Sequence, residues 1–164
     1  MNVTKITIES IISASTKKVW DYYTNPEHII KWNFASDDWH CPKAENDLRV
    51  GGKLKSRMEA KDGSFGFDFE GVYDGVINQR KIAYTMPDSR QVITNFENLE
   101  GKTKVTTTFD AENENPVEMQ RAGWQSILDN LKSMLNLNKM KKNILTNFDR
   151  KLYAKINNVE RHYT

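Results

Sequence analysis

A single change of hydrophobic period near residue 115 is the feature that most constrains how this chain can fold. Before it, apolar and polar residues alternate as they do in strands, and after it apolar residues recur at helical spacing. Asn115 and Pro116 supply an N-cap and a proline at the first helical position, so the pattern predicts one long helix over residues 116–137. The apolar stripe of this helix is Val117, Trp124, Leu128, Leu131 and Leu135.

Six segments before this change are predicted as strands. They cover residues 5–12, 53–61, 65–77, 82–86, 91–97 and 103–111. The alternation is clearest over residues 53–61, where Leu54, Ser56 and Met58 are separated by charged side chains. That pattern is typical of an antiparallel sheet with one buried face and one solvent-exposed face. Asp62-Gly63 then predicts a hairpin turn.

Two short helices are predicted after the first strand. Residues 13–16 offer an N-cap to the first, and Asn25-Pro26 begins the second. The Asp- and Asn-rich segment that follows is predicted as a loop, which lasts until Gly51-Gly52. Because one helix cannot cover both faces of such a sheet, the sheet is expected to curl around it. The predicted fold class is α+β, with a curved antiparallel sheet of about six to seven strands wrapped around a long C-terminal helix.

Length and charge indicate how the chain is divided. Its 164 residues, 38% hydrophobic and 28% charged, are typical of one globular domain. We expect that domain to span residues 1–137 and a basic extension, helical or mobile, to span residues 138–164. Residues 139–164 hold seven Lys or Arg and two acids, a net charge of +5, which leaves −3 for the rest of a chain whose total is +2. An acidic body argues against nucleic acid as a partner.

The cysteine content and hydropathy indicate the compartment. Cys41 is the one cysteine, so no internal disulfide can form, which fits a reducing environment. No stretch approaches ~20 consecutive apolar residues, and the N-terminus has no leader pattern, so no membrane span is expected. The expected location is the cytoplasm, with the protein a monomer or a weak homodimer.

Several segments carry a resemblance to a known family. They are residues 19–28 (VWDYYTNPEH), 31–32 (KW), 39–42 (WHCP), 51–52 (GG), 62–71 (DGSFGFDFEG), 120–124 (QRAGW) and 128–131 (LDNL). With the order of elements, these segments resemble the START-like (SRPBCC) superfamily. The branch is the one related to the C-terminal domain of the activator of the ninety-kilodalton heat-shock-protein ATPase. The resemblance covers roughly residues 3–136 and implies a helix-grip fold.

The resemblance also implies a cavity between the concave face of the sheet and the long helix. The function expected first is non-catalytic binding there of a small hydrophobic ligand, such as a lipid, a polyketide or an aromatic metabolite. The alternative is a regulator of a chaperone ATPase that acts through protein contacts. A third reading is an enzyme of the polyketide cyclase or hydrolase type. No cofactor is implied by any of the three.

The alternation along the strands and the helical period of the apolar stripe predict which side chains face the cavity. They give candidate ligand-binding residues on the inner face of the sheet, at the predicted mouth of the cavity and on the helix stripe. These are Trp39, Met58, Phe67, Phe69, Tyr84, Met86, Thr94, Phe96, Gln120, Trp124 and Leu128. Aromatic and Met side chains suit an adaptable apolar pocket, but the same residues could simply fill a core. The polar members need partners, which a ligand, a neighbouring side chain or a water could supply.

Catalytic and metal chemistry find little support in the sequence. A group of aromatic, acidic and imidazole side chains could serve as an acid/base site, or could belong to a packed loop. This group is Trp32, Asp37, Asp38, Trp39 and His40. The three histidines His28, His40 and His162 are scattered without metal-ligand spacing, so no metal is expected. No catalytic residue is assigned.

Overall fold

The computed structural model describes residues 3–137 and 140. The predicted basic extension over residues 138–164 therefore lies, apart from Met140, outside the described residues. The elements are β1 (Lys5–Ile12), α1 (Thr16–Thr24), α2 (Pro26–Ile29), β2 (Trp39–Asn46), β3 (Lys53–Ala60), β4 (Gly66–Ile77), β5 (Lys81–Thr85), β6 (Gln91–Leu99) and β7 (Lys102–Asp110). A long helix over residues 117–137 follows β7. Within the described residues, no helix is both long and apolar enough to cross a membrane.

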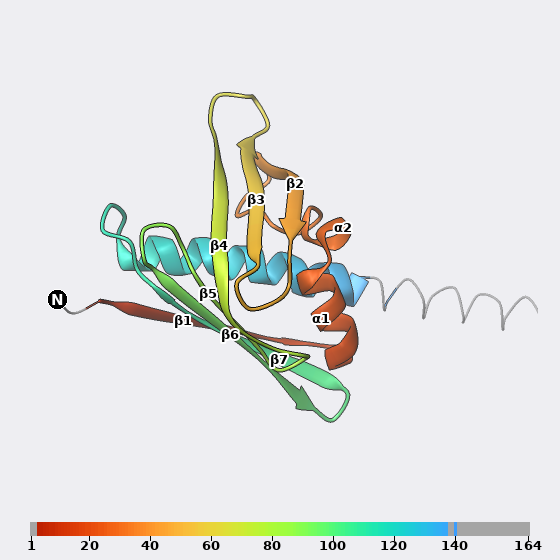
Figure 1. The fold of residues 1–164 in the computed structure, drawn as a ribbon. Coiled ribbons are helices and arrows are strands. Elements are labelled where there is room, and N and C mark those ends of the chain that lie inside the picture. Colours follow the sequence, from red (N-terminus) through yellow and green to blue (C-terminus); the bar gives the residue numbers. More distant parts are fainter. Residues whose placement is uncertain (1–2, 138–139, 141–164) are drawn as a thin grey trace, which may run out of the picture.

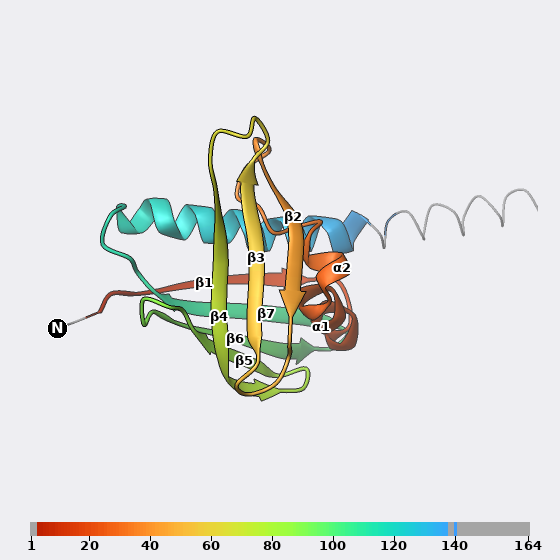
Figure 2. The same ribbon diagram turned by 45° about the horizontal axis from the view of Figure 1, so that its top comes forward.

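The seven strands of the described residues belong to one antiparallel sheet. Their order is β1-β7-β6-β5-β4-β3-β2. The first strand pairs with the last one, and the other neighbouring strands are consecutive in the sequence. Figures 1 and 2 show the long helix lying across the strands, while the sheet curves around it. α1 and α2 lie beside one end of β2 and close that end of the fold. This is the predicted helix-grip architecture, and the fold class is confirmed.

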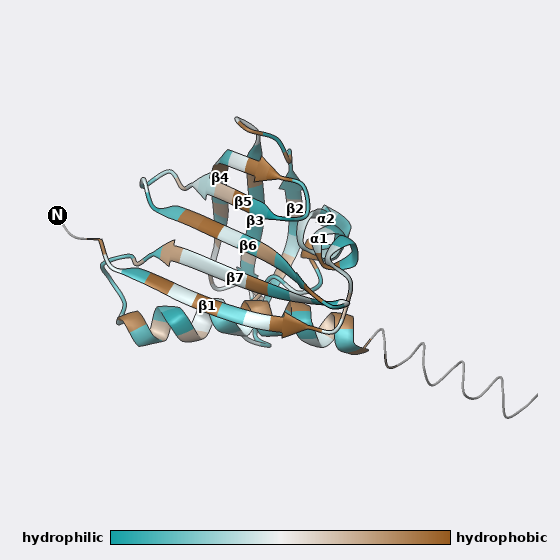
Figure 3. Ribbon diagram, turned by 90° about the horizontal axis from the view of Figure 1, so that it is seen from below, coloured by the Kyte–Doolittle hydropathy of each residue, from teal (hydrophilic) through white to brown (hydrophobic). Residues whose placement is uncertain are grey.

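The core lies between the concave face of the sheet and the long helix. In β1 every second residue is buried, and the same alternation of apolar and polar residues is visible along the strands in Figure 3. From the helix, Leu131 and Leu135 are fully buried and Leu128 nearly so. Burying a leucine side chain contributes roughly 1.5–3 kcal/mol, so these three residues anchor the helix to the sheet.

Two polar contacts also hold the helix against the free edge of the sheet. Arg121 donates from Nη1 to the carbonyl of Thr7 at 3.0 Å, and Gln125 donates from Nε2 to the carbonyl of Glu9 at 3.1 Å. Both carbonyls belong to the edge strand β1. An edge strand otherwise exposes unpaired backbone groups, so these contacts cover part of a surface that would be open to another chain.

The six predicted strands are all present, with ends that differ by at most two residues from the prediction. The predicted turn is also present, with Gly63 at φ 78° and the Asp62 carboxylate accepting from the backbone N–H of Ser64. By contrast, the loop predicted before Gly51-Gly52 was wrong, because it contains strand β2. A register shift between His40 and Lys43 interrupts the alternation of β2. Pro42 is tolerated because β2 is an edge strand.

Candidate functional site

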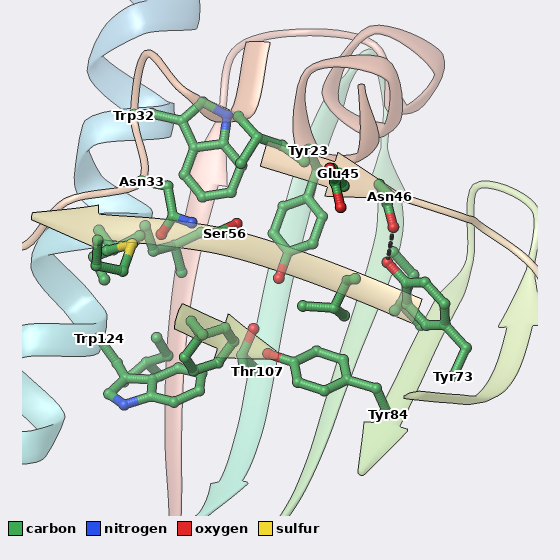
Figure 4. Close-up of a pocket in the computed structure, with 18 of the residues that line it drawn as sticks. Tyr23, Trp32, Asn33, Glu45, Asn46, Ser56, Tyr73, Tyr84, Thr107 and Trp124 are labelled. Atoms are coloured by element: carbon green, nitrogen blue, oxygen red, sulfur yellow. Dashed lines mark hydrogen bonds between the residues drawn. The ribbon is translucent and has the colours of Figure 1, made fainter. Parts of the chain in front are cut away.

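A cavity of about 230 Å³ lies between the sheet and the long helix. Residues from β1, α1, α2, β2, β3, β4, β5, β7 and the helix line it, and most of them are apolar or aromatic. Figure 4 shows side chains from these elements arranged around a common space. Protein interiors leave few voids larger than a water molecule, so an opening of this size in the core is a candidate binding site.

Trp124 of the long helix forms one wall of the cavity. Its indole stacks on Phe109 of β7, with ring centroids 4.0 Å apart and an interplanar angle of 11°. It also meets Phe69 of β4 edge-on, with centroids 5.9 Å apart. Such aromatic pairs contribute about 0.5–1.5 kcal/mol beyond burial, so the indole is held in one orientation against the sheet.

Tyr84 of β5 forms another wall, and Gly71 of β4 makes room for it. A Cβ atom added at Gly71 would lie 2.5 Å from Cδ2 of the Tyr84 ring. The ring also packs edge-on against Phe69 and Tyr73, with centroids 6.2 Å away in each case. Strand pairing runs through Gly71 without interruption, and the irregularity of β4 lies between Tyr73 and Gly75.

A chain of hydroxyl groups lies beside the cavity. The hydroxyls of Thr94 and Thr107 are 2.8 Å apart on neighbouring strands β6 and β7, and the Tyr23 hydroxyl lies 3.3 Å from Thr94. Burial raises the pKa of the Tyr23 hydroxyl, and its hydrogen bonds to the two threonines only partly oppose that effect. All three hydroxyls therefore stay protonated, and each can donate or accept.

Tyr73 closes another side of the cavity through a hydrogen bond to Asn46. The Tyr73 hydroxyl donates to Oδ1 of Asn46, whose Nδ2 donates in turn to the carbonyl of Thr24 at 2.7 Å (Figure 4). Burial raises the pKa of the Tyr73 hydroxyl, and the negative field of a nearby ionised tyrosine would raise it further. The bond ties β2 to both β4 and the end of α1.

Tyr84 differs from the other two tyrosines because its hydroxyl has no hydrogen bond to any residue that the structure describes. Figure 4 shows this hydroxyl pointing into the cavity, on the same side as Thr107. The residue is 7% exposed. Burial holds the pKa of Tyr84 well above its ordinary value, so the hydroxyl remains a neutral donor.

Charged groups are scarce around the cavity. Of the described lining residues, Glu45 is the one with an ionisable side chain besides the tyrosines, and it pairs with Lys43 at 3.1 Å on the surface. Among the described residues, no group of three or more His, Cys, Asp or Glu is placed to hold a metal ion. None of the lining residues in the described part of the chain therefore offers a charge of either sign that is buried and unpaired.

The residues considered as an acid/base site do not form one. Trp32 lines the cavity and donates its indole N–H to the carbonyl of Tyr22 at 2.9 Å. His40 lies at the surface, 3.6 Å from the carboxylate of Glu59, and Asp38 accepts from Ser36. These side chains face different surroundings, so they do not converge on one reacting atom.

Six of the eleven candidate ligand-binding residues line the cavity. They are Met58, Phe67, Phe69, Tyr84, Trp124 and Leu128. The strands were predicted from alternation and the helix stripe from helical spacing, and both place these residues on the inner side. Periodicity alone could therefore identify them. Whether they contact a ligand stays a prediction.

The other five candidates lie outside the lining. Thr94 is engaged with Tyr23 and Thr107 behind the wall, Met86 is buried in the core, and Phe96 packs edge-on against Trp20 and Tyr23. Gln120 was expected to offer a polar contact, but it binds the loop before the helix. Its side chain accepts from the backbone N–H of Glu112 at 2.9 Å and donates to the carbonyl of Asn115 at 2.8 Å.

Trp39, the fifth of these, belongs to an exposed aromatic cluster beside the cavity mouth. The cluster consists of Trp39, Phe65 and Phe67, whose ring centroids lie 6.0–6.3 Å apart. Phe65 is 62% exposed and Phe67 is 42% exposed, yet Phe67 also lines the cavity. The cluster therefore continues the apolar lining out to the molecular surface.

Sequence reasoning missed several lining residues, among them Tyr23, Asn33, Asn46 and Tyr73. Continued alternation from Phe67 through Phe69 would have placed Tyr73 on the inner face. Asn33 and Asn46 lie in or beside the segment that was predicted as a loop. Tyr23 lies on α1, outside the strands and the helix stripe from which the candidates were drawn.

Comparison with known proteins agrees with the fold. The family described as "Activator of Hsp90 ATPase homolog 1-like protein" matches residues 13–136. The solved AHSA1-like protein from Aeromonas hydrophila is 41% identical, with a TM-score of 0.78 over 83% of this chain and 94% of that chain. A protein from Cytophaga hutchinsonii is 46% identical, with a TM-score of 0.72 and the same two coverages.

More distant structures share the fold alone. A protein from Nitrosomonas europaea is 17% identical, with a TM-score of 0.70 over 83% of this chain and 96% of that chain. No curated protein sequence matches.

Proposed function

The chain belongs to the Activator of Hsp90 ATPase homolog 1-like protein family, and on that premise we propose that it binds a small apolar molecule without transforming it. The observation that carries this proposal is the cavity of about 230 Å³ between the sheet and the long helix. Its aromatic and aliphatic lining, with a few convergent hydroxyls, has the composition of a small-molecule site. A bound apolar ligand would gain the free energy of leaving water.

The size of the cavity favours a compact ligand over a long-chain lipid. Ligand pockets usually measure roughly 300–1,000 Å³, and this cavity lies just below that range. The rings of Trp32, Tyr84 and Trp124 give the lining several aromatic faces and edges. Of the classes considered, an aromatic metabolite therefore fits better than a lipid or a large polyketide.

The ionisation of the lining favours binding over catalysis. A general base needs a pKa near the working pH and a place within reach of the substrate. Burial raises the pKa of Tyr23, Tyr73 and Tyr84, so these groups stay protonated. Glu45 is engaged with Lys43 at the surface. A cyclase or hydrolase mechanism has no evident proton acceptor among the described lining residues.

Thermal denaturation with a panel of aromatic metabolites, polyketides and lipids tests the proposal. A ligand present at ~100 times its dissociation constant should stabilise the protein by about 2.7 kcal/mol. Ser56→Leu should remove this stabilisation, because Ser56 lines the cavity and the larger side chain would occupy it. The quantity to compare is the ligand-induced shift in Tm, which is measured separately for each variant.

Lys55→Leu is the matched control. It places the same new side chain on the same strand, but on the outer face, where Lys55 lies near Asp68 and Glu70. The control should keep the ligand-induced shift. A panel that produces no shift in the wild type would count against the proposal, as would a shift that survives Ser56→Leu.

A second candidate function, regulation of a chaperone ATPase, is favoured by a separate observation. The exposed aromatic cluster Trp39, Phe65 and Phe67 is the kind of apolar surface that marks protein interaction sites. If this candidate is right, the protein should change the ATPase turnover of a purified Hsp90, and Phe65→Ser should abolish the change while small-molecule binding persists. Unchanged turnover with the wild-type protein would exclude this role.

A further inference from the structure

We propose that the cavity selects uncharged ligands that carry an acceptor oxygen, such as a ketone or ester carbonyl, and that the Tyr84 hydroxyl recognises that oxygen. This inference rests on the proposed function, because it requires that a ligand enters the cavity. Tyr84 would then be a specificity-determining residue of the site, not a catalytic one.

The first support is the missing partner of the Tyr84 hydroxyl. In the described part of the chain, Tyr73 donates to Asn46 and Tyr23 joins the threonine pair, whereas the Tyr84 hydroxyl makes no hydrogen bond. This hydroxyl points into the cavity (Figure 4), where its proton has no acceptor among the described residues. A ligand oxygen in the cavity would supply the missing acceptor.

The second support is that the hydroxyl is held in position before any ligand arrives. The ring of Tyr84 lies over Gly71, where even a methyl group would collide with it, and it packs edge-on between Phe69 and Tyr73. A donor that is already oriented loses little entropy when it binds, so its hydrogen bond discriminates well between ligands. Burial also keeps the pKa of the hydroxyl high, so that the proton is present at neutral pH.

The third support is the charge of the surroundings. Among the lining residues that the structure describes there is no Lys, Arg or His, so an anionic ligand would find no counter-charge on them. Arg90, the cation whose field reaches Tyr84, is outside the lining and pairs with Asp88 at 2.7 Å. Moving an unpaired charge into an apolar site is far more costly than moving a neutral carbonyl, so neutral ligands are favoured.

Acetophenone and ethylbenzene are matched probes, because they differ by a carbonyl in place of a methylene. Affinities would be measured by NMR titration of the full-length wild type and the Tyr84→Phe variant. Loss of one neutral hydrogen bond should weaken acetophenone binding roughly five- to tenfold. Ethylbenzene should bind both proteins equally well. Negatively charged 4-acetylbenzoate should bind the wild type at least about tenfold more weakly than acetophenone does.

The possible results separate this inference from the proposed function. If ethylbenzene and acetophenone both bind and Tyr84→Phe weakens neither, the cavity binds apolar molecules but the role of Tyr84 is wrong. If 4-acetylbenzoate binds as tightly as acetophenone, the selection for neutral ligands is wrong. If neither neutral probe shifts the signals of cavity residues at millimolar concentration, this inference is wrong, and the proposed function fails as well only if the wider ligand panel also gives no shift in Tm. Tyr84→Phe must keep the wild-type pattern of amide signals outside the cavity.

Discussion

Asp110, at the end of β7, is a buried carboxylate whose partners come from two other strands. It accepts from Nζ of Lys5 at 2.6 Å and from the backbone N–H of Gln91 at 2.9 Å, and it is 7% exposed. Burial alone would raise the pKa of the Asp110 carboxyl. The hydrogen bonds from Lys5 and Gln91 outweigh that effect and hold the pKa below its ordinary value. The native state therefore favours the ionised form.

Asp110→Asn should consequently lower the free energy of unfolding at neutral pH by about 1.5–3 kcal/mol, which is typical for hydrogen bonds to a charged group. Because the pKa is lower in the folded than in the unfolded chain, this contribution is complete above the unfolded pKa of ~3.9 and is lost as the pH falls through the folded pKa. Urea denaturation between pH 3 and pH 7 should show the two stability curves converging on the acid side.

Asp129→Asn is the control for Asp110→Asn. It makes the same change of charge on the exposed side of the long helix, where Asp129 accepts a hydrogen bond from Gln125 at 2.9 Å. Its effect should stay within ~0.5 kcal/mol at every pH. A constant difference between wild type and Asp110→Asn across the whole range would show that the ionised carboxylate is not what stabilises this end of β7.

Strand β4 shows how one element positions the site. Gly71→Ala should destabilise the protein by about 1–3 kcal/mol, because the new methyl group would lie 2.5 Å from the Tyr84 ring, which packed neighbours prevent from moving freely. Gly75→Ala on the same strand should be neutral or stabilising by up to about 1 kcal/mol, because its Cβ would meet only the Cβ of Ala83, at 3.8 Å. Chemical denaturation of both variants measures the difference.

Ligand binding adds a second readout to the same pair of variants. If Tyr84 is displaced in Gly71→Ala, the affinity for a carbonyl ligand should fall, while Gly75→Ala should bind like the wild type. Equal stability of the two variants would mean that the backbone of β4 moves to accommodate the new methyl group at Gly71. Gly71 would then not fix the position of the Tyr84 ring.

The elements that could be predicted from the sequence are those whose side-chain period is uninterrupted. The strand at residues 53–60 and the long helix have clean patterns, because each presents one face to the core and one to water. Strand β2 could not be predicted, because Pro42 and a register shift break its alternation at the edge of the sheet. The second helix begins at Pro26 as predicted, and Pro26–Ile29 forms about one turn.

The cavity is a property of the whole molecule, and this limits what sequence reasoning can reach. Periodicity tells which residues face inward, and it correctly grouped Phe69, Tyr84 and Trp124. Periodicity does not show where the inward-facing side chains leave a cavity between them. That depends on how far the sheet curls and on pairs such as Tyr73 with Asn46, which join segments 27 residues apart.

Whether residues 1–137 fold without the C-terminal extension can be tested by truncation. A chain that stops after Leu137 should fold, keep its Tm within a few degrees of the full-length protein, and bind the same ligands. The family match ends at residue 136, and the helix residues that anchor to the sheet, Leu128, Leu131 and Leu135, all precede the cut. Circular dichroism and the ligand-induced shift in Tm measure both properties.

A second truncation, after Ile127, serves as the contrast. It removes three buried leucines, and each such loss costs about 2–5 kcal/mol even for truncation to alanine. The sum reaches the whole net stability of a typical domain, about 5–15 kcal/mol, so this shorter chain should not fold. If the chain that ends at Leu137 also failed to fold, residues 138–164 would have to contribute to the domain itself, and its boundary would lie beyond the family match.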